Sequence, residues 1–325
     1  MTGHPDIVFL FPGQGSHSVG MGKAFFDAYP SVRTLFGEAS DLIKKDLRRL
    51  CFEGPEPTLV QTDNVQPAIT LVNLACLQVL REEGVVPSAA AGHSLGEYAA
   101  LHAAGVLSFA DTMRLVQVRG SAMQEAATRN PGGMLAVVGL DIETVSRICG
   151  EVKDVGSVEV ANHNSPLQVA LTGQTDALQK AAELAKQKGA RLTIALKVSG
   201  PWHSRFMADA KTPMRHALET CALAPPALPV IANVTADAYA TEPDRIRETL
   251  IEQIVRPVRW VDSMNKLVRE GHRTFVEVGP GKVLSGLMRD ISREVKMLNV
   301  QDMDSLLKLR QFLSTPESRI PNPGS

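Results

Sequence analysis

The chain has 325 residues, which is long enough to bury a large hydrophobic core without disulfide bonds or structural metals. Its 34 basic and 35 acidic residues give a net charge of −1 at pH 7, and this balance argues against a protein that binds nucleic acid. The apolar N-terminal segment is too short for a signal sequence or a membrane span, and the four cysteines lack metal-binding spacing. We therefore expect a cytoplasmic protein with no membrane segment and with buried, reduced thiols.

Strands alternate with helices in the first part of the chain, which is typical of a parallel α/β sheet. A continuous apolar run at residues 7–11 predicts a buried strand that ends at a Pro-Gly pair. Apolar residues at helical spacing predict a helix within 65–83, and a short apolar run predicts another strand at 89–91. A capping box opens a further helix over 108–127, which carries Arg119 on an apolar face.

The pattern changes after residue 130 and predicts the order βαββαβ, which is that of a ferredoxin-like unit. The expected strands are 134–138, 158–161, 168–171 and 191–196, and the expected helices are 142–149 and 176–188. Further on, we expect strands near 230–234 and 275–278 and a helix near 245–255.

These elements predict an α/β fold with two domains. A large α/β-hydrolase-like domain with a parallel sheet is expected from residues 1–130 and 198–314, with a ferredoxin-like subdomain inserted at 131–197. Residues 315–325 are rich in Pro and Ser, and we expect them to form a disordered tail. A cleft should form between the two domains.

Residues 92–96 read GHSLG and lie between an apolar run and a helix-like segment. Glycines two residues before and after a serine allow a sharp turn from strand to helix that exposes the hydroxyl group. This context predicts that Ser94 is a nucleophile and that the N–H of Leu95 is a donor to the oxyanion. The GxSxG pattern also arises by chance, so the rest of the sequence has to show whether Ser94 is catalytic.

A serine nucleophile needs a general base within hydrogen-bond reach, and histidine suits this role because its pKa lies near neutrality. Among the eight histidines, His203 lies directly after the last strand of the inserted unit, where the chain returns to the large domain. A solvated or capping loop histidine is the alternative. His93 adjoins Ser94, but neighbours on a sharp turn point apart, so we expect His93 to support the turn.

Arg119 shares a helix face with Leu115 and Met123, where an unpaired guanidinium is costly to bury. One possibility is that an Asp or Glu of the same chain pairs with it. The other is that it binds a carboxylate of the substrate through its two-pronged guanidinium, a geometry that lysine cannot reproduce. The sequence pattern by itself leaves both open.

Seven motifs appear in order along the chain and are together far more specific than any one of them. They are FPGQGS at 11–16, GHSLGEY at 92–98, VRG at 118–120 with MQ at 123–124, NHNSP at 162–166 with QV at 168–169, GPWHS at 200–204, Gln253 before PVRW at 257–260, and EVGPG at 277–281. This set resembles the malonyl-CoA:acyl carrier protein transacylases, and the match extends from Val8 to about Val300.

The resemblance implies a role for each residue around the nucleophile. Ser94 is expected to be the nucleophile and His203 the base, while Gln14 joins the Leu95 N–H in stabilising the oxyanion. A backbone carbonyl at Gln253, rather than an acid, is expected to orient the histidine. No metal or redox cofactor is implied, because a CoA thioester is the substrate.

The resemblance also implies how the acyl group is held. Arg119 would bind the malonyl carboxylate, and His93, Trp202, Asn164 and Gln253 are expected among the substrate-binding residues. Trp202 is bulkier than the residue expected directly before the base. It either reshapes the acyl pocket or packs at the junction of the two domains.

The implied reaction is ping-pong: malonyl-CoA acylates Ser94, CoA leaves, and the phosphopantetheine thiol of an acyl carrier protein attacks the acyl-enzyme. The alternative on the same fold is a hydrolase of acyl groups stalled on carrier proteins, although varied acyl chains have little use for the Arg119 cation. A silent scaffold and an unrelated α/β-hydrolase esterase rank lower. We expect a monomer that serves fatty acid synthesis, polyketide synthesis or malonate decarboxylation.

Overall fold

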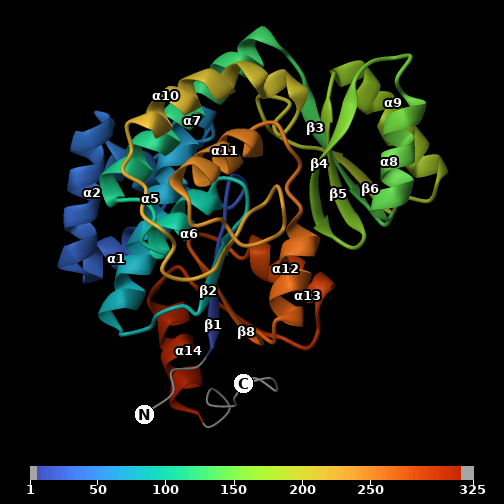
Figure 1. Ribbon diagram of the computed structural model, residues 1–325. Helices are drawn as coiled ribbons and strands as arrows, with labels where there is room; N and C mark the ends of the chain where they lie inside the picture. Colours follow the sequence, from blue (N-terminus) through green and yellow to red (C-terminus); the bar gives the residue numbers. More distant parts are fainter. Residues whose placement is uncertain (1–5, 316–325) are drawn as a thin grey trace.

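The computed structural model describes residues 6–315 and contains two separate sheets (Figure 1). The larger sheet is parallel, with the strand order β7-β2-β1-β8-β9. Its strands are β1 (Ile7–Phe11), β2 (Ala89–Gly92), β7 (Val230–Ile231), β8 (Thr274–Val278) and β9 (Lys296–Val300). The strands expected at 7–11, 89–91 and 275–278 are confirmed, whereas the one expected near 230–234 is much shorter.

Helices cover both faces of the parallel sheet, because successive side chains of a strand point to opposite faces. Ile7, Phe9 and Phe11 belong to the core shared with α5, α6 and α7, while Val8 and Leu10 pack with α12 and α13. The helices of the large part are α1 (Lys23–Ala28), α2 (Pro30–Ile43), α3 (Leu47–Phe52), α4 (Glu56–Leu59), α5 (Thr62–Glu82), α6 (Gly96–Ala103), α7 (Phe109–Arg129), α10 (Lys211–Glu219), α11 (Pro243–Gln253), α12 (Trp260–Arg269), α13 (Val283–Ile291) and α14 (Met303–Ser314), with a 3₁₀ helix η1 (Arg205–Ala210).

The smaller sheet is antiparallel, with the strand order β4-β5-β3-β6, and helices α8 and α9 pack against one of its faces (Figure 1). Its elements are β3 (Gly133–Val138), α8 (Ile142–Glu151), β4 (Val158–Ser165), β5 (Gln168–Gly173), α9 (Thr175–Gln187) and β6 (Leu192–Ala195). The expected order βαββαβ is confirmed, and so is an α/β fold with a parallel and a separate antiparallel sheet.

Strand β4 continues past its expected end at Ala161 because its second half also contacts the large part of the chain. The Val258 N–H donates to the Ala161 carbonyl at 2.8 Å, and the His163 N–H donates to the Val258 carbonyl at 2.9 Å. These bonds join the small sheet to the segment that precedes α12.

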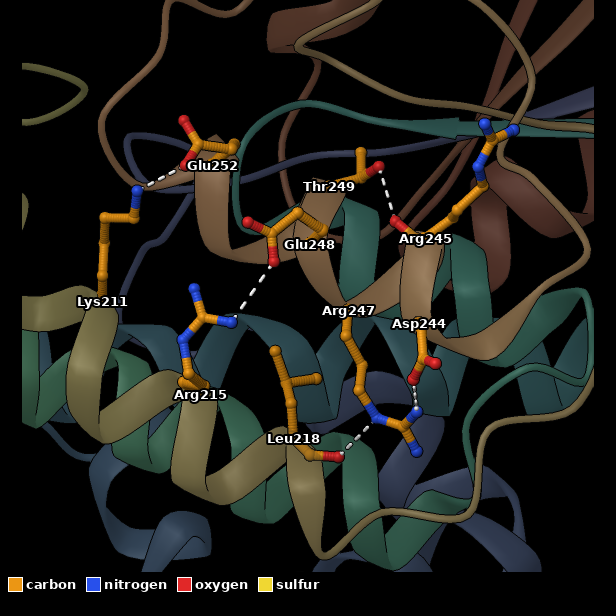
Figure 2. Close-up of polar contacts among 9 residues, drawn as sticks. All are labelled: Lys211, Arg215, Leu218, Asp244, Arg245, Arg247, Glu248, Thr249 and Glu252. Atoms are coloured by element: carbon orange, nitrogen blue, oxygen red, sulfur yellow. Dashed lines mark hydrogen bonds and ion pairs between the residues drawn. The ribbon is translucent and has the colours of Figure 1, made fainter.

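Helices α10 and α11 are joined by polar contacts along their length (Figure 2). The contacts are Lys211 with Glu252, Arg215 with Glu248 at 3.3 Å, and Arg247 with the Leu218 carbonyl at 3.1 Å. Exposed ion pairs each contribute only about 0–1 kcal/mol, so the contacts fix the register of the helices more than they add stability. This register matters because α10 follows His203 and α11 ends at Gln253.

The remaining expectations concern the C-terminal tail, membrane-spanning helices and the cysteines. The disordered tail expected at 315–325 lies outside the described residues, apart from Thr315. No helix in the part of the chain that the structure describes is long and apolar enough to cross a membrane. Cys51, Cys76 and Cys221 are buried free thiols, as expected, whereas the free Cys149 is only half-buried.

Candidate active site

The sharp turn predicted at residues 92–96 connects β2 to α6. Ser94 has a φ angle of 50°, in the left-handed region that residues other than glycine rarely adopt. Both flanking glycines are required by close backbone contacts. A Cβ atom on Gly92 would lie 1.9 Å from the Gly96 carbonyl carbon, and one on Gly96 would lie 2.0 Å from the Phe11 carbonyl oxygen. The glycine spacing therefore serves the turn as predicted.

The structure brings Ser94 and His203 into direct contact, with Ser94 Oγ 2.7 Å from His203 Nε2. His203 Nδ1 lies 2.9 Å from the backbone carbonyl oxygen of Gln253. Because a carbonyl oxygen can only accept, Nδ1 carries the proton and the Nε2 lone pair faces the serine hydroxyl. Burial and the positive charge of Arg119 lower the pKa of His203 to about 3. The imidazole is thus neutral at pH 7 and able to accept a proton.

Arg119 lies beside this pair and is only 1% exposed. Its Nη2 donates to Ser94 Oγ at 3.1 Å and to Gln253 Oε1 at 3.0 Å, and its Nη1 donates to Gln66 Oε1 at 2.8 Å. Within residues 6–315 these hydrogen-bond partners are neutral, and no Asp or Glu that would form an internal ion pair is among them. A buried guanidinium without a carboxylate partner is able to bind an anion beside the nucleophile.

A pocket of about 430 Å³ lies between the two sheets in front of Ser94. Eight of the nine predicted site residues line it: Gln14, His93, Ser94, Leu95, Arg119, Asn164, Trp202 and His203. The ninth, Gln253, is fully buried and reaches the site through its contacts with Arg119 and His203. The residues that the motifs predict therefore gather at one cavity, although they come from both sheets.

Gln14 and Leu95, the predicted oxyanion donors, come from adjoining segments. A Cβ atom on Gly13 would lie 2.5 Å from the His93 carbonyl oxygen and 3.5 Å from the Leu95 nitrogen, so the loop that carries Gln14 lies against the nucleophile turn. Leu95 immediately precedes α6, where backbone N–H groups have no partner within the helix. Both residues face the pocket, as oxyanion donors must.

His93, the residue before the nucleophile, contacts the small sheet. Its Nε2 lies 2.8 Å from Asn164 Oδ1, and its ring lies 5.2 Å from the ring of Trp260. Burial lowers the pKa of His93. These contacts link the turn to β4, and His93 also lines the pocket, so support of the turn and substrate binding both stay predictions.

Trp202 both packs and lines the pocket, so the structure is compatible with either role predicted for it. The side chain is 5% exposed, and a Cβ atom on Gly200 would lie 2.8 Å from its ring. Its Nε1 is buried with no hydrogen-bond partner among the residues described.

Two polar side chains at the site, Asn233 and Gln66, were not predicted from the sequence, and no role was predicted for Glu97. Asn233 Oδ1 accepts the Ser94 N–H at 2.7 Å, and its Nδ2 donates to the Gly92 carbonyl at 2.7 Å. One signal was present, because Asn233 lies at the end of the strand expected near 230–234, at the carboxyl edge of the parallel sheet. Gln66 left only a weak signal, as a polar residue among apolar ones.

Comparisons with known proteins identify the family of this chain. Residues 8–310 match the family of the acyl transferase domain. The chain is 43% identical over 301 residues to the malonyl CoA-acyl carrier protein transacylase of Bacillus subtilis (strain 168), covering 92% of this chain and 95% of that relative. It also resembles the crystal structure of acyl-carrier-protein-S-malonyltransferase from Bartonella henselae, with a TM-score of 0.91, 38% identity, and coverage of 95% and 100% of the two chains.

A second solved structure is a type II PKS acyl-carrier protein in complex with its malonyl-transacylase, and it matches with a TM-score of 0.91, 37% identity, and coverage of 94% and 99%. The chain belongs to the acyl transferase family and is an acyltransferase. More narrowly, the resemblance to the malonyl-CoA:acyl carrier protein transacylases is confirmed.

Proposed function

We propose that this chain transfers a malonyl group from malonyl-CoA to the phosphopantetheine thiol of an acyl carrier protein. Arg119 is the observation that carries the proposal, because a buried guanidinium 3.1 Å from Ser94 Oγ has neutral hydrogen-bond partners within residues 6–315. A malonyl thioester supplies a carboxylate close to the carbonyl that Ser94 attacks. The relatives described above are malonyl transacylases, which supports the same activity.

In the first half-reaction, Ser94 Oγ attacks the thioester carbonyl of malonyl-CoA and its proton passes to His203 Nε2. The negative charge that develops on the carbonyl oxygen is stabilised by the Leu95 N–H and the Gln14 amide. As the intermediate collapses, the carbon–sulfur bond breaks and His203 returns the proton to the departing CoA sulfur. The malonyl group is then an ester of Ser94.

In the second half-reaction, the thiol of the carrier protein attacks that ester and gives its proton to His203. The intermediate releases Ser94 Oγ, which regains the proton from His203 Nε2. The 2.7 Å contact between these two atoms suits proton transfer in both directions. The reaction balances with the CoA thioester and the carrier thiol alone, so we assign no metal or redox cofactor to it.

Binding of the malonyl carboxylate by Arg119 sets the acyl preference in this proposal. Gln66 and Gln253 each accept a hydrogen bond from a different terminal nitrogen, so the guanidinium plane is held in one orientation. Hydrolysis of varied acyl groups gains nothing from a buried cation, and none of the relatives named above is a hydrolase.

We also propose which known folds the two domains resemble, the oligomeric state and the compartment. The large domain, residues 1–130 and 198–314, is α/β-hydrolase-like, and residues 131–197 form a ferredoxin-like insertion, which the strand order β4-β5-β3-β6 supports. We propose a monomer, because the two domains already build the cleft in front of Ser94 between them. We place the reaction in the cytoplasm, in keeping with the four free cysteines.

The test is to mix the protein with malonyl-CoA or acetyl-CoA, add a holo carrier protein, and follow intact masses together with released free acid. We expect malonyl on Ser94 and then on the carrier, with acetyl poorly used and Ser94→Ala inactive. Release of free malonate without loading of the carrier would indicate a hydrolase. A folded protein that takes up no acyl group would contradict the proposal.

A further inference from the structure

A buried polar cluster lies directly behind the nucleophile turn and consists of Glu97, Asn233 and Gln253. All three residues are 0% exposed. Glu97 lies in the first turn of α6, Asn233 follows β7, and Gln253 ends α11, so the cluster joins three separate segments. Burying a carboxyl group is costly unless hydrogen bonds compensate it, which makes the partners of Glu97 informative.

Glu97 contacts both other members of the cluster. Its Oε1 accepts the backbone N–H of Asn233 at 2.7 Å and the Tyr239 hydroxyl at 3.1 Å, and its Oε2 accepts from Gln253 Nε2. Burial raises the pKa of Glu97 to about 7, while these three donors favour the ionised form, in which both oxygens accept. One side chain thus holds two segments that are distant in sequence.

Each of these two segments reaches one member of the reacting pair. Asn233 Oδ1 accepts the Ser94 N–H at 2.7 Å. The Gln253 carbonyl accepts from His203 Nδ1 at 2.9 Å, and Gln253 Nε2 donates to the Ser94 carbonyl at 2.8 Å. Glu97 is therefore linked to Ser94 through one intervening residue, Asn233, and to His203 through another, Gln253.

We propose that Glu97 is a positioning residue for both halves of the Ser94–His203 pair, acting through Asn233 behind the serine and through Gln253 behind the histidine. This inference rests on the proposed function only in taking Ser94 as the nucleophile. Ser94 and His203 have φ angles of 50° and 57°, and such strained backbone persists where the surroundings hold it.

The chemistry of the Gln253 amide gives a second reason. Because an ionised carboxylate only accepts, Glu97 requires the NH₂ side of the Gln253 amide to face it. The Oε1 atom then faces Arg119, whose Nη2 donates to it at 3.0 Å. Glu97, together with the Ser94 carbonyl that accepts from the same Nε2 atom at 2.8 Å, therefore sets the orientation of the amide that holds Arg119.

The first test variant is Glu97→Gln, which keeps the shape of the side chain but replaces one acceptor oxygen with an NH₂ donor. This NH₂ group faces an N–H donor of either Asn233 or Gln253, so one of the two links is lost. We expect kcat for malonyl transfer to fall by about 10- to 100-fold, as for small displacements of reacting groups. The KM for malonyl-CoA should rise by less than kcat falls, because Glu97 does not line the pocket and Gln66 still holds Arg119.

Tyr239→Phe is the matched control, because it removes one hydrogen bond from the same carboxyl group without breaking the links to Asn233 and Gln253. A purely structural Glu97 would give thermal unfolding shifts in both variants and a wild-type kcat in both. A positioning role predicts that kcat falls in Glu97→Gln and stays at the wild-type level in Tyr239→Phe.

The wild-type protein is measured first, by single-turnover acylation with malonyl-CoA and mass analysis of the Ser94 peptide. If the wild type is not acylated at Ser94, the proposed function fails. If it is acylated and a folded Glu97→Gln protein keeps the wild-type kcat, the positioning role is refuted. Should Glu97→Gln not fold, Glu97→Asp retains the charge but is too short to hold both partners, and a wild-type kcat in that variant refutes the role equally.

Discussion

Replacement of Arg119 by alanine should remove the preference for malonyl over acetyl groups. The guanidinium is 1% exposed, so a carboxylate bound to it forms a desolvated ion pair. Loss of one partner from such a pair costs about 3–5 kcal/mol. At about 1.4 kcal/mol for each factor of ten, kcat/KM for malonyl-CoA should fall at least about 100-fold further than kcat/KM for acetyl-CoA.

The assay measures the rate of Ser94 acylation at low concentrations of malonyl-CoA and acetyl-CoA, so that the ratio of the two kcat/KM values is obtained for each variant. Arg119→Lys retains the charge without the two-pronged geometry and should lose part of the preference. Arg114→Ala is the matched control on the same helix, since that side chain is 60% exposed and lies 3.8 Å from Asp111. Its ratio should equal that of the wild type.

An equal loss of malonyl and acetyl transfer in Arg119→Ala would refute the carboxylate role. Arg119 would then act on Ser94 Oγ, which its Nη2 contacts at 3.1 Å, or on the fold alone. The variant leaves Gln66 and Gln253 each with an unpaired acceptor, at a cost of about 1–3 kcal/mol per buried group. Thermal unfolding must therefore show that the variant is folded before the ratio is interpreted.

Two further predictions concern stability. The pKa of His203 is lowered from 6.5 to about 3 in the folded protein. At a pH between these two values the unfolded chain binds a proton that the folded protein does not, so stability falls on acidification. The unfolding free energy of the wild type, relative to His203→Gln, should drop by about 3 kcal/mol between pH 6.5 and pH 4 in urea titrations, and a constant difference would contradict this. Gly96→Ala places a Cβ atom 2.0 Å from the Phe11 carbonyl oxygen and should destabilise the protein by more than about 3 kcal/mol. Gly37→Ala in helix α2 adds a Cβ that meets no atom within 4 Å apart from its chain neighbours and the helix's own backbone. It should instead stabilise the protein by up to about 1 kcal/mol, and similar melting temperatures for the two variants would refute the steric account.

The sequence predicted the turn at Ser94 and most of the elements because their signals are local. Glycine spacing defines the turn, and apolar periodicity defines the strands and helices. The strand expected near residue 230 ends early at Ile231, and β4 runs longer because it bonds to Val258. Both differences depend on neighbours that are remote in sequence, which a local pattern does not contain.

The surroundings of the site were harder to predict for the same reason. Asn233 is 139 residues from Ser94, and the glutamines that hold Arg119 lie 53 and 134 residues from it. The sequence pattern left open whether Arg119 has an internal acidic partner. In the folded protein, Arg119 donates instead to two neutral amides, because the side chains that α5 and α11 direct at it are Gln66 and Gln253.

Charge balance gives a physical reason why a neutral carbonyl, rather than an acid, orients His203. A carboxylate in the position of the Gln253 carbonyl would raise the pKa of His203 and would compete with the substrate for Arg119. Glu97 is a buried acid in this region, yet the Gln253 side chain touches both it and Arg119, with its NH₂ group toward the acid and its oxygen toward the guanidinium. The amide thus transmits orientation without giving Arg119 a directly bonded anion. The guanidinium charge is left for the carboxylate that arrives with the acyl group.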